Sequence, residues 1–344
     1  MDAAGTGPRT LQKAVPFALV PTWNRPPASL LPLPCTSRPA WNRWGGWIVL
    51  DRPHRSPTLP TTIDPQLATK LTDARLQVHH AAQLATAMGI SYLPARSDDS
   101  HTNLEWLSGA GVLASHVLSG DPPFRIGVRV ADLTLCMLNG GNGLLGTVPL
   151  HGRTIEQAAA WLRERIGDAG ADPARFTLAR HYTIPHHAVD DGATFDASAS
   201  EDFKQLAAWF ELGASALSRI RAAYDGSEVR CWPHHFDIAT VTTISPDRTV
   251  GVGLEPGDVY YDEPYFYVNM RPVPPVDALT ATPAGGGIWH THDWIGAVLP
   301  GSRLAAGSTR RELREQADTF LDSAVAACRA LVARDGQIAG ATSP

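Results

Sequence analysis

The sequence has few cysteines and no long apolar run, and each absence excludes a class of protein. The four cysteines, Cys35, Cys136, Cys231 and Cys328, stand far apart and form no CxxC pair, which excludes a zinc ribbon or a dithiol redox motif. Their low density also argues against a disulfide framework and fits a reducing compartment, so we expect a cytoplasmic protein. No segment reaches the roughly 18 consecutive apolar residues that a membrane-spanning helix needs.

Clustered basic residues are also missing. The 344-residue chain carries 29 lysines and arginines against 34 aspartates and glutamates, which gives a net charge of −5 at pH 7. Nucleic acids and anionic membrane surfaces are usually bound through a basic stripe, because both partners are negatively charged. We therefore expect neither of these partners, and a small molecule is the class of ligand that the composition leaves open.

The sequence shows no signature of nucleophilic catalysis. It contains neither a GxSxG nucleophile elbow nor an SxxK pair, and no cysteine stands beside a plausible base. The glycine-rich segment NGGNG at residues 139–143 lacks the GK[ST] of a phosphate-binding loop and precedes no predicted helix, so we interpret it as a hairpin turn.

The composition is that of a globular protein behind a proline-rich leader. Hydrophobic residues make up 44% of the chain and charged residues 18%. Residues 1–62 are rich in proline and show no sustained periodicity, so we predict a disordered leader there, with a tryptophan anchor at residues 41–47 as the exception. We divide the rest into an N-terminal half (63–199), a C-terminal half (200–335) and a frayed tail (336–344).

Periodicity and capping residues predict the order helix, strands, two helices, strands, helix. The first helix is expected to begin at Asp64 and end at Gly89. Three later helices open at Thr154, Ser198 and Thr309, each followed three residues later by Glu or Gln. Segregated runs of strands and helices favour an α+β fold with antiparallel sheets and packed helices. An arrangement of two sheet-plus-helix halves is an alternative within that class.

Two histidine-containing segments in the C-terminal half are the strongest candidates for a functional site. In IWHTHDW, His290 and His292 would project from the same side of a strand, where two imidazoles can ligate one metal ion. In WPHHFD, His235 and Asp237 would share a strand face, and either one would complete a site suited to Zn²⁺ or Fe²⁺. Histidines that are held by structural hydrogen bonds are the alternative.

Three further assignments concern proton transfer. Glu263, His79 and Asp237 carry the titratable groups that we assign to catalysis in the same site. His79 and Arg75 lie one turn apart on the first predicted helix, so both would point to the same side of it. For that pair, a solvated helix face is the simpler interpretation.

Several motifs resemble those of a bacterial family catalogued only as a domain of unknown function. The shared positions are His79 and Gln83, Trp232, Phe236 and Asp237, Glu263, Pro264, Phe266 and Tyr267, and Trp289, His290, Leu299 and Pro300. The resemblance covers about residues 65–330 and implies the same architecture, whereas it implies no activity. The family pattern carries a single histidine at the position of His290, and a partner like His292 is not part of it.

The sequence therefore supports two functional hypotheses from different classes. The first is a metal-dependent enzyme that acts on a small molecule through His290 and His292, with a divalent metal as cofactor. The second is a non-catalytic module that binds a small ligand or a protein in an aromatic and histidine-lined pocket. Tyr265 and Tyr267 alternate with apolar residues and would line such a pocket, although a half-buried strand explains their spacing equally well.

Overall fold

The computed structural model describes residue 60, residues 63–64, residues 70–304 and residues 309–339. The predicted disordered leader and its tryptophan anchor lie outside the described residues, apart from Pro60. Of the predicted tail, the part up to Ala339 continues the last helix, and the remainder lies outside the described residues.

Four α-helices and eleven strands build the described part of the chain, and their order confirms the predicted α+β class. The first half contains α1 (Thr72–Tyr92), β1 (Glu105–Leu107), β2 (Val112–Ala114), β3 (Phe124–Arg129), β4 (Thr134–Asn139), β5 (Leu144–Pro149) and α2 (Ile155–Asp168). The second half contains α3 (Ser200–Tyr224), β6 (Arg230–Trp232), β7 (Asp237–Ser245), β8 (Arg248–Glu255), β9 (Tyr265–Arg271), β10 (Ile288–His290), β11 (Gly296–Pro300) and α4 (Arg310–Ala339). Each run of strands is thus flanked by helices.

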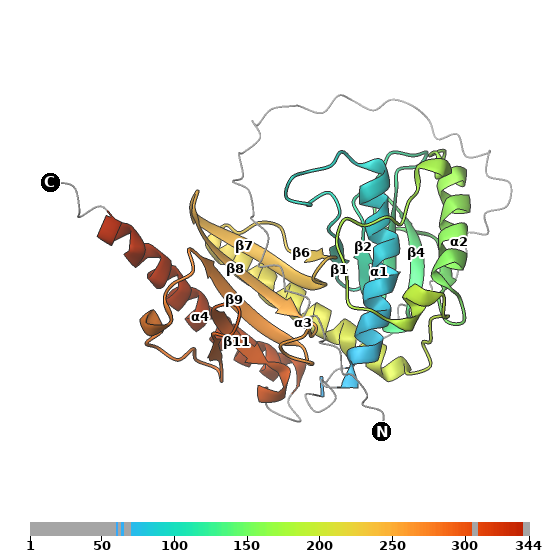
Figure 1. The fold of residues 1–344 in the computed structure, drawn as a ribbon. Helices are drawn as coiled ribbons and strands as arrows, with labels where there is room; N and C mark the ends of the chain where they lie inside the picture. The colour runs from blue at the N-terminus through green and yellow to red at the C-terminus, as the bar shows by residue number, and fades with distance from the viewer. Residues whose placement is uncertain (1–59, 61–62, 65–69, 305–308, 340–344) are drawn as a thin grey trace, which may run out of the picture.

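The strands form two antiparallel sheets that meet at one edge (Figure 1). The first sheet has the order β1-β2-β3-β4-β5, and the second has the order β10-β11-β9-β8-β7-β6. Leu104, just before β1, and Cys231, in β6, exchange two backbone hydrogen bonds with N···O distances of 2.9 and 2.8 Å. The outer strands β1 and β6 are therefore joined at this point.

Helices cover one face of each sheet and bury most of the apolar side chains. In Figure 1, α1 and α2 lie against the first sheet, whereas α3 and α4 run along the second. α3 also contacts α1 and β1, so the core is continuous between the two halves. Gly213 allows α3 to approach the second sheet closely, because an added Cβ there would lie 3.1 Å from the Cβ of Leu254. None of the described helices has both the length and the apolar character that crossing a membrane requires.

Two of the three predicted capping boxes are confirmed. Thr154 caps α2, and its side chain accepts the backbone hydrogen bond from Gln157 that the motif predicts. Thr309 caps α4 in the same way, with a donor to Oγ1 at 3.3 Å. The prediction for Ser198 is wrong, because the N-cap of α3 is Ala199, which has no capping side chain.

The predicted limits of the first helix are also wrong. α1 begins at Thr72 rather than at Asp64, and it continues past Gly89 to Tyr92. Gly89 serves close packing instead of ending the helix, since an added Cβ would lie only 2.1 Å from the carbonyl oxygen of His101. A glycine that looks like a stop signal is here required by the approach of another segment.

The two faces of the second sheet are covered by different parts of the chain. Ile238, Leu254 and Phe266 belong to the main core and face α3 and α4. Residues at the alternate positions point to the opposite face, because successive side chains in a strand alternate. That face packs against Tyr261 of the β8–β9 loop and Trp294 of the β10–β11 loop. It carries most of the polar and aromatic residues discussed below.

Candidate functional site

Two carboxyl side chains lie next to each other at one end of the second sheet. Asp237 is the first residue of β7, and Glu255 is the last residue of β8. Because Ile238 pairs with Leu254, the two acids occupy neighbouring positions on adjacent strands. Both point to the face opposite to α3 and α4. We call Asp237 and Glu255 the carboxyl pair.

The carboxyl pair is buried and incompletely hydrogen-bonded. Asp237 is 3% exposed and Glu255 is 6% exposed. The hydroxyl of Tyr267 donates to Oδ2 of Asp237. In contrast, Oδ1 of Asp237 and Oε1 of Glu255 accept no hydrogen bond from any described residue. A buried polar atom without a partner costs about 1–3 kcal/mol, so two such atoms on adjacent strands require an explanation.

Burial raises the pKa of both carboxyls. It raises the pKa of Asp237, and the nearby ring of His235 offsets part of that rise. It raises the pKa of Glu255 well above its usual range; the negative charges of Asp237 and Asp258 raise it further, and the charge of Arg75 opposes them. Two carboxyls this close do not ionise independently. The pair therefore holds a proton at pH values where exposed carboxyls are ionised.

Tyr267 reaches Asp237 by lying across the intervening strand. Tyr267 is in β9 and Asp237 is in β7, with β8 between them. At Gly253, the β8 residue that pairs with Tyr267, an added Cβ would lie 2.4 Å from Cζ of the tyrosine ring. Glycine at this position leaves the space in which the ring lies, and the hydrogen bond between Tyr267 and Asp237 therefore depends on it.

The loop between β8 and β9 is held beside the carboxyl pair by residues from both halves. Arg75, from α1, donates to the carbonyl oxygen of Gly257 and forms an ion pair with Asp262 at an N···O distance of 3.1 Å. The hydroxyl of Tyr265 donates to Oδ2 of Asp258 at 2.9 Å. The position of this loop is therefore fixed by α1 on one side and by β9 on the other.

An aromatic row leads from the carboxyl pair towards the surface. The row consists of Tyr267, Tyr265, Tyr261, His290 and Trp294, in this order. Successive ring centroids lie 6.4, 4.8, 5.6 and 4.4 Å apart. Tyr267 and Tyr265 are buried, whereas Tyr261 and Trp294 are partly exposed, so the row connects the interior with the solvent.

His290 and His292 do not face one another. Strand β10 ends at His290, and His292 lies in the bend that follows, so the prediction that both leave the same side of one strand is wrong. Nε2 of His290 donates to the carbonyl oxygen of His292 at 2.6 Å, and Nδ1 lies 3.0 Å from the hydroxyl oxygen of Tyr261. The ring of His292 is 84% exposed and pairs with Asp293 at 3.0 Å. Both ring nitrogens of His290 are thus engaged within the protein.

Residues 233–236 of the WPHHFD segment form a turn between β6 and β7, so the segment is not one continuous strand. The backbone N–H groups of His235 and Phe236 both donate to the carbonyl oxygen of Trp232, at 3.1 and 2.6 Å. Pro233 has no N–H to contribute to a strand pair and lies at the start of this turn. His235 is exposed whereas Asp237 is buried, so the predicted shared face is wrong. Within the described ranges, no group of three or more His, Cys, Asp or Glu side chains is placed to hold a metal ion.

Arg75, His79 and Gln83 on α1 are buried against the second half of the molecule. The interpretation of Arg75 and His79 as a solvated helix face is therefore wrong. His79 is buried, its Nε2 donates to the carbonyl oxygen of Pro233 at 2.8 Å, and its ring stacks on Phe236 with centroids 4.6 Å apart. Gln83 donates to the same carbonyl at 3.0 Å. Burial lowers the pKa of His79 to about 3, so the ring is neutral at physiological pH and positions the β6–β7 turn.

Glu263 has a structural contact outside the carboxyl pair. Its carboxylate accepts hydrogen bonds from the backbone N and from Oγ of Ser302, at 2.5 and 2.8 Å, where the short 3-10 helix Gly301–Arg303 begins. Of the residues predicted from sequence, Asp237 and His290 lie on the same face of the second sheet, where Asp237 bonds to the first ring of the aromatic row and His290 is its fourth member. The other predicted site residues do not belong to the carboxyl pair or to the aromatic row; they are His79, His235, Glu263 and His292.

Glu255 is a site residue that the histidine motifs do not indicate. Its signal lies in the alternation of its own strand, where Gly251, Gly253 and Glu255 occupy one face while valine and leucine occupy the other. Two glycines on one strand face indicate that another segment lies close to that face, and Glu255 follows them on the same side of the strand. Tyr265 and Tyr267 share one face, as their spacing predicts.

Comparison with known proteins adds no assignment to this site. No family model matches the chain, and neither the curated proteins nor the solved structures contain a match to it. The resemblance to a bacterial family that the motifs indicate therefore stays a prediction. Because a fold alone does not determine a function, the function has to be inferred from the geometry of the site.

Proposed function

We propose that the protein binds a small organic cation, an amine attached to an apolar or aromatic body, at the carboxyl pair and the aromatic row. The observation that supports this proposal is the carboxyl pair itself. Asp237 and Glu255 are adjacent and buried, and each keeps one oxygen to which no described residue donates a hydrogen bond. A protonated amine supplies both N–H donors and a positive charge, which are the two properties that this pair needs.

The aromatic row favours a cationic ligand over an anionic or a neutral one. The faces of tyrosine and tryptophan rings attract a cation by about 0.5–2 kcal/mol, depending on how far the cation is desolvated. Asp258, which accepts a hydrogen bond from Tyr265, adds a further carboxylate beside the row. An anion in this place would be repelled by three carboxyl groups and by the negative faces of the rings, whereas the charge of Arg75 is already paired with Asp262. A cation would be attracted by the carboxyls and by the ring faces.

Ligand binding and proton release are linked in this proposal. Burial raises the pKa of both carboxyls, and the charge of Asp237 raises that of Glu255 further, so the pair of the free protein holds a proton at pH values where exposed carboxyls have lost theirs. An ammonium group placed beside the pair stabilises the ionised form and lowers its pKa, so a proton leaves for the solvent when the amine binds. The expected signature is binding that releases protons and that strengthens with pH for as long as the amine stays protonated.

Proton transfer to a bound small molecule is a second candidate function. Carboxyls whose pKa is raised by burial are suited to act as general acids, and the hydroxyl of Tyr267 holds Asp237 in one orientation. The metal-dependent enzyme predicted from His290 and His292 stays a prediction, since the two rings are directed to different partners.

Calorimetric titration with benzylamine tests the proposal. The full-length wild type is compared with Glu255→Gln and with Glu315→Gln, a control at an acid on α4 that is 64% exposed. Each titration is repeated in phosphate and in Tris, because the heat then reports the protons released. We expect benzylamine to bind with proton release, and benzyl alcohol, which has the same ring without the charge, to bind about tenfold or more weakly.

The variants decide where the amine binds. Glu255→Gln should weaken benzylamine binding by about tenfold or more and reduce the proton release, whereas Glu315→Gln should change neither. Circular dichroism checks that the variants keep the fold, and Asp237→Asn serves as the second variant at the carboxyl pair. No binding of benzylamine or of tetramethylammonium at millimolar concentration would refute the proposal. Equal binding of benzylamine and benzyl alcohol would refute it as well.

A further inference from the structure

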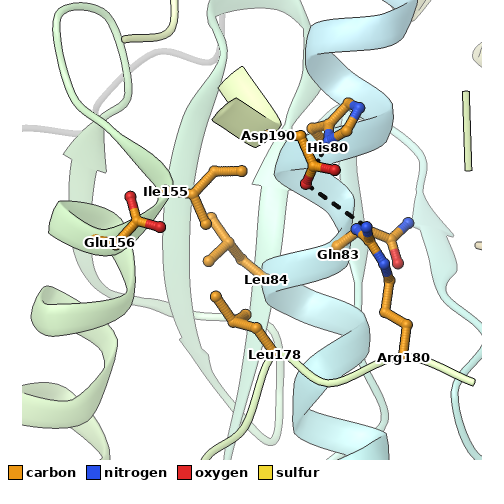
Figure 2. A pocket seen from close by; sticks show the side chains of 8 residues that line it. All are labelled: His80, Gln83, Leu84, Ile155, Glu156, Leu178, Arg180 and Asp190. Carbon is orange, nitrogen blue, oxygen red and sulfur yellow. Dashed lines mark ion pairs between the residues drawn. The ribbon is translucent and has the colours of Figure 1, made fainter. Parts of the chain in front are cut away.

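A second candidate site lies in the first half of the molecule and shares no residue with the carboxyl pair. α1, the start of α2 and the segment 178–190 enclose a hollow of about 210 Å³, which suits a small molecule rather than a drug-sized ligand. Figure 2 shows Glu156 of α2 on one side of this hollow and Asp190 with Arg180 on the other. The apolar wall between them consists of Leu84, Ile155 and Leu178.

His80 presents a ring nitrogen without a partner to this hollow. The residue is 1% exposed, and its Nε2 lies 3.0 Å from the carbonyl oxygen of Pro185. Because a carbonyl only accepts, Nε2 carries the hydrogen and Nδ1 of the neutral ring is an acceptor. Burial lowers the pKa of His80, which keeps the ring neutral. Nδ1 is buried and receives no hydrogen bond from any residue of the described chain.

Asp190 places a second acceptor opposite this nitrogen. Oδ1 of Asp190 lies 3.7 Å from Nδ1 of His80 and 3.6 Å from Nη2 of Arg180, as the dashed lines in Figure 2 indicate. Two acceptors do not bond to each other, and a donor that lies beside both of them would satisfy both. The part of the hollow next to His80 and Asp190 is therefore suited to an N–H group of a ligand.

Arg180 offers the complementary group. Its only charged contact within the described residues is the ion pair with Asp190 at 3.6 Å, which is longer than a hydrogen bond. The side chain is 22% exposed, so a ligand in the hollow can reach it. A guanidinium is planar and binds carboxylates through two parallel hydrogen bonds. The hollow thus combines a site for a donor with a site for a carboxylate.

We infer that this hollow binds a small aliphatic α-amino acid. The ammonium group would donate to Nδ1 of His80 and Oδ1 of Asp190, and the carboxylate would accept from Arg180. The aliphatic side chain would lie against the apolar wall. Glu156, across the hollow, has no charged partner among the described residues and favours a ligand with an ammonium group over a simple carboxylic acid. This site goes beyond the proposed function, because its residues and its ligand are different.

L-leucine is the probe for this inference, with two analogues that each lack one of its charges. Isoamylamine has the same carbon skeleton without the carboxylate, and 4-methylpentanoate has it without the ammonium group. Binding to the full-length protein is measured by calorimetry and by the shift of the melting temperature. Isoamylamine is also an amine of the kind proposed for the carboxyl pair, so L-leucine and its analogues are compared in Glu255→Gln protein. There we expect L-leucine to bind and to raise the melting temperature, and both analogues to bind about tenfold or more weakly.

Neighbouring acids supply a matched pair of variants. Asp190 lines the hollow, whereas Asp191 pairs with His186 at 2.8 Å on the surface and does not line it. Asp190→Asn and Arg180→Gln should each weaken L-leucine binding by about tenfold or more. Asp191→Asn should leave it unchanged. Glu255→Gln should also leave it unchanged, which separates this site from the carboxyl pair.

Three results would overturn the inference. The first is the absence of a melting-temperature shift and of binding heat when L-leucine is added to the wild type. The second is equal binding of L-leucine and either analogue to Glu255→Gln protein. The third is an equal loss of affinity in Asp190→Asn and Asp191→Asn. Circular dichroism confirms that each variant is folded, and Asp190→Asn alone decides the matter if Arg180→Gln does not fold.

Discussion

Replacement of His79 by glutamine is expected to change how the stability of the protein depends on pH. Burial lowers the pKa of His79 from 6.5 to about 3, and the hydrogen bond to Pro233 offsets only part of that change. As the pH falls below 6.5 the unfolded chain takes up a proton at this residue, whereas the folded chain does not do so until about pH 3. The free energy of unfolding therefore falls as the pH falls through this window.

The two pKa values of His79 determine the size of the effect. Each pKa unit between the folded and unfolded states corresponds to about 1.4 kcal/mol, so protonation of His79 in the unfolded chain lowers the free energy of unfolding by up to roughly 5 kcal/mol by the time the pH reaches about 3. From about pH 8 to about pH 5, the loss is roughly 2 kcal/mol. Glutamine has no titratable group in this range, and its amide can donate to the same carbonyl of Pro233.

Urea denaturation at about pH 8 and at about pH 5 measures the effect. We expect the wild type to lose roughly 2 kcal/mol more than His79→Gln over this interval. His186→Gln is the matched control, because its ring is 70% exposed and pairs with Asp191 on the surface. Other buried groups titrate in both proteins and cancel in the difference. Equal losses in the wild type and in His79→Gln would show that burial does not hold this ring neutral.

Three further predictions concern the second sheet. Gly253→Ala should destabilise the protein by about 1–3 kcal/mol in urea denaturation, because the new methyl group displaces the ring of Tyr267. Gly167→Ala, in an open part of α2, should not destabilise it in this way, and equal effects of the two variants would contradict the reasoning. Glu255→Gln should gain stability relative to the wild type as the pH rises above the usual carboxyl range, because the unfolded wild-type chain releases the Glu255 proton at a lower pH than the folded chain. A difference in the free energy of unfolding between the two proteins that is the same at every pH would argue against it. His292→Ala should leave the melting temperature and the zinc and iron content of tag-free protein unchanged, because its ring is 84% exposed; loss of a stoichiometric metal in this variant would instead support the metal site predicted from sequence.

Sequence signals predicted the fold well where a residue acts on its close neighbours in the chain. Thr154 and Thr309 satisfy backbone groups within one helical turn, and the structure confirms both. The polar-aromatic face of β9 likewise follows from the alternation within a single strand. Ser198 is the exception, since its backbone N–H donates to the side chain of Asp196 at 2.9 Å in a turn that precedes α3. A capping motif therefore failed where another local hydrogen bond competed with it.

The candidate site depends on contacts between distant residues, and spacing alone does not predict these. Two histidines separated by one residue look the same in a strand and in a bend. Because His290 pairs with Gly296 at the end of β10, the residues between them have to form the connection, and His292 falls within it. The partner of Asp237 is set by the register of β7 against β8, which places Glu255 beside it. Register is a property of the whole sheet, and no motif encodes it.

The backbone link between Leu104 and Cys231 has a consequence for any attempt to divide this protein. At that link, the backbone groups of one residue at the edge of each sheet are paired with those of the other sheet. A fragment that contained only one half would leave the N–H and C=O groups of Leu104 or Cys231 open at the edge of its sheet, and open edges template self-association. Cutting the chain between α2 and α3 is therefore expected to yield fragments that aggregate, even though each contains a complete sheet and two helices.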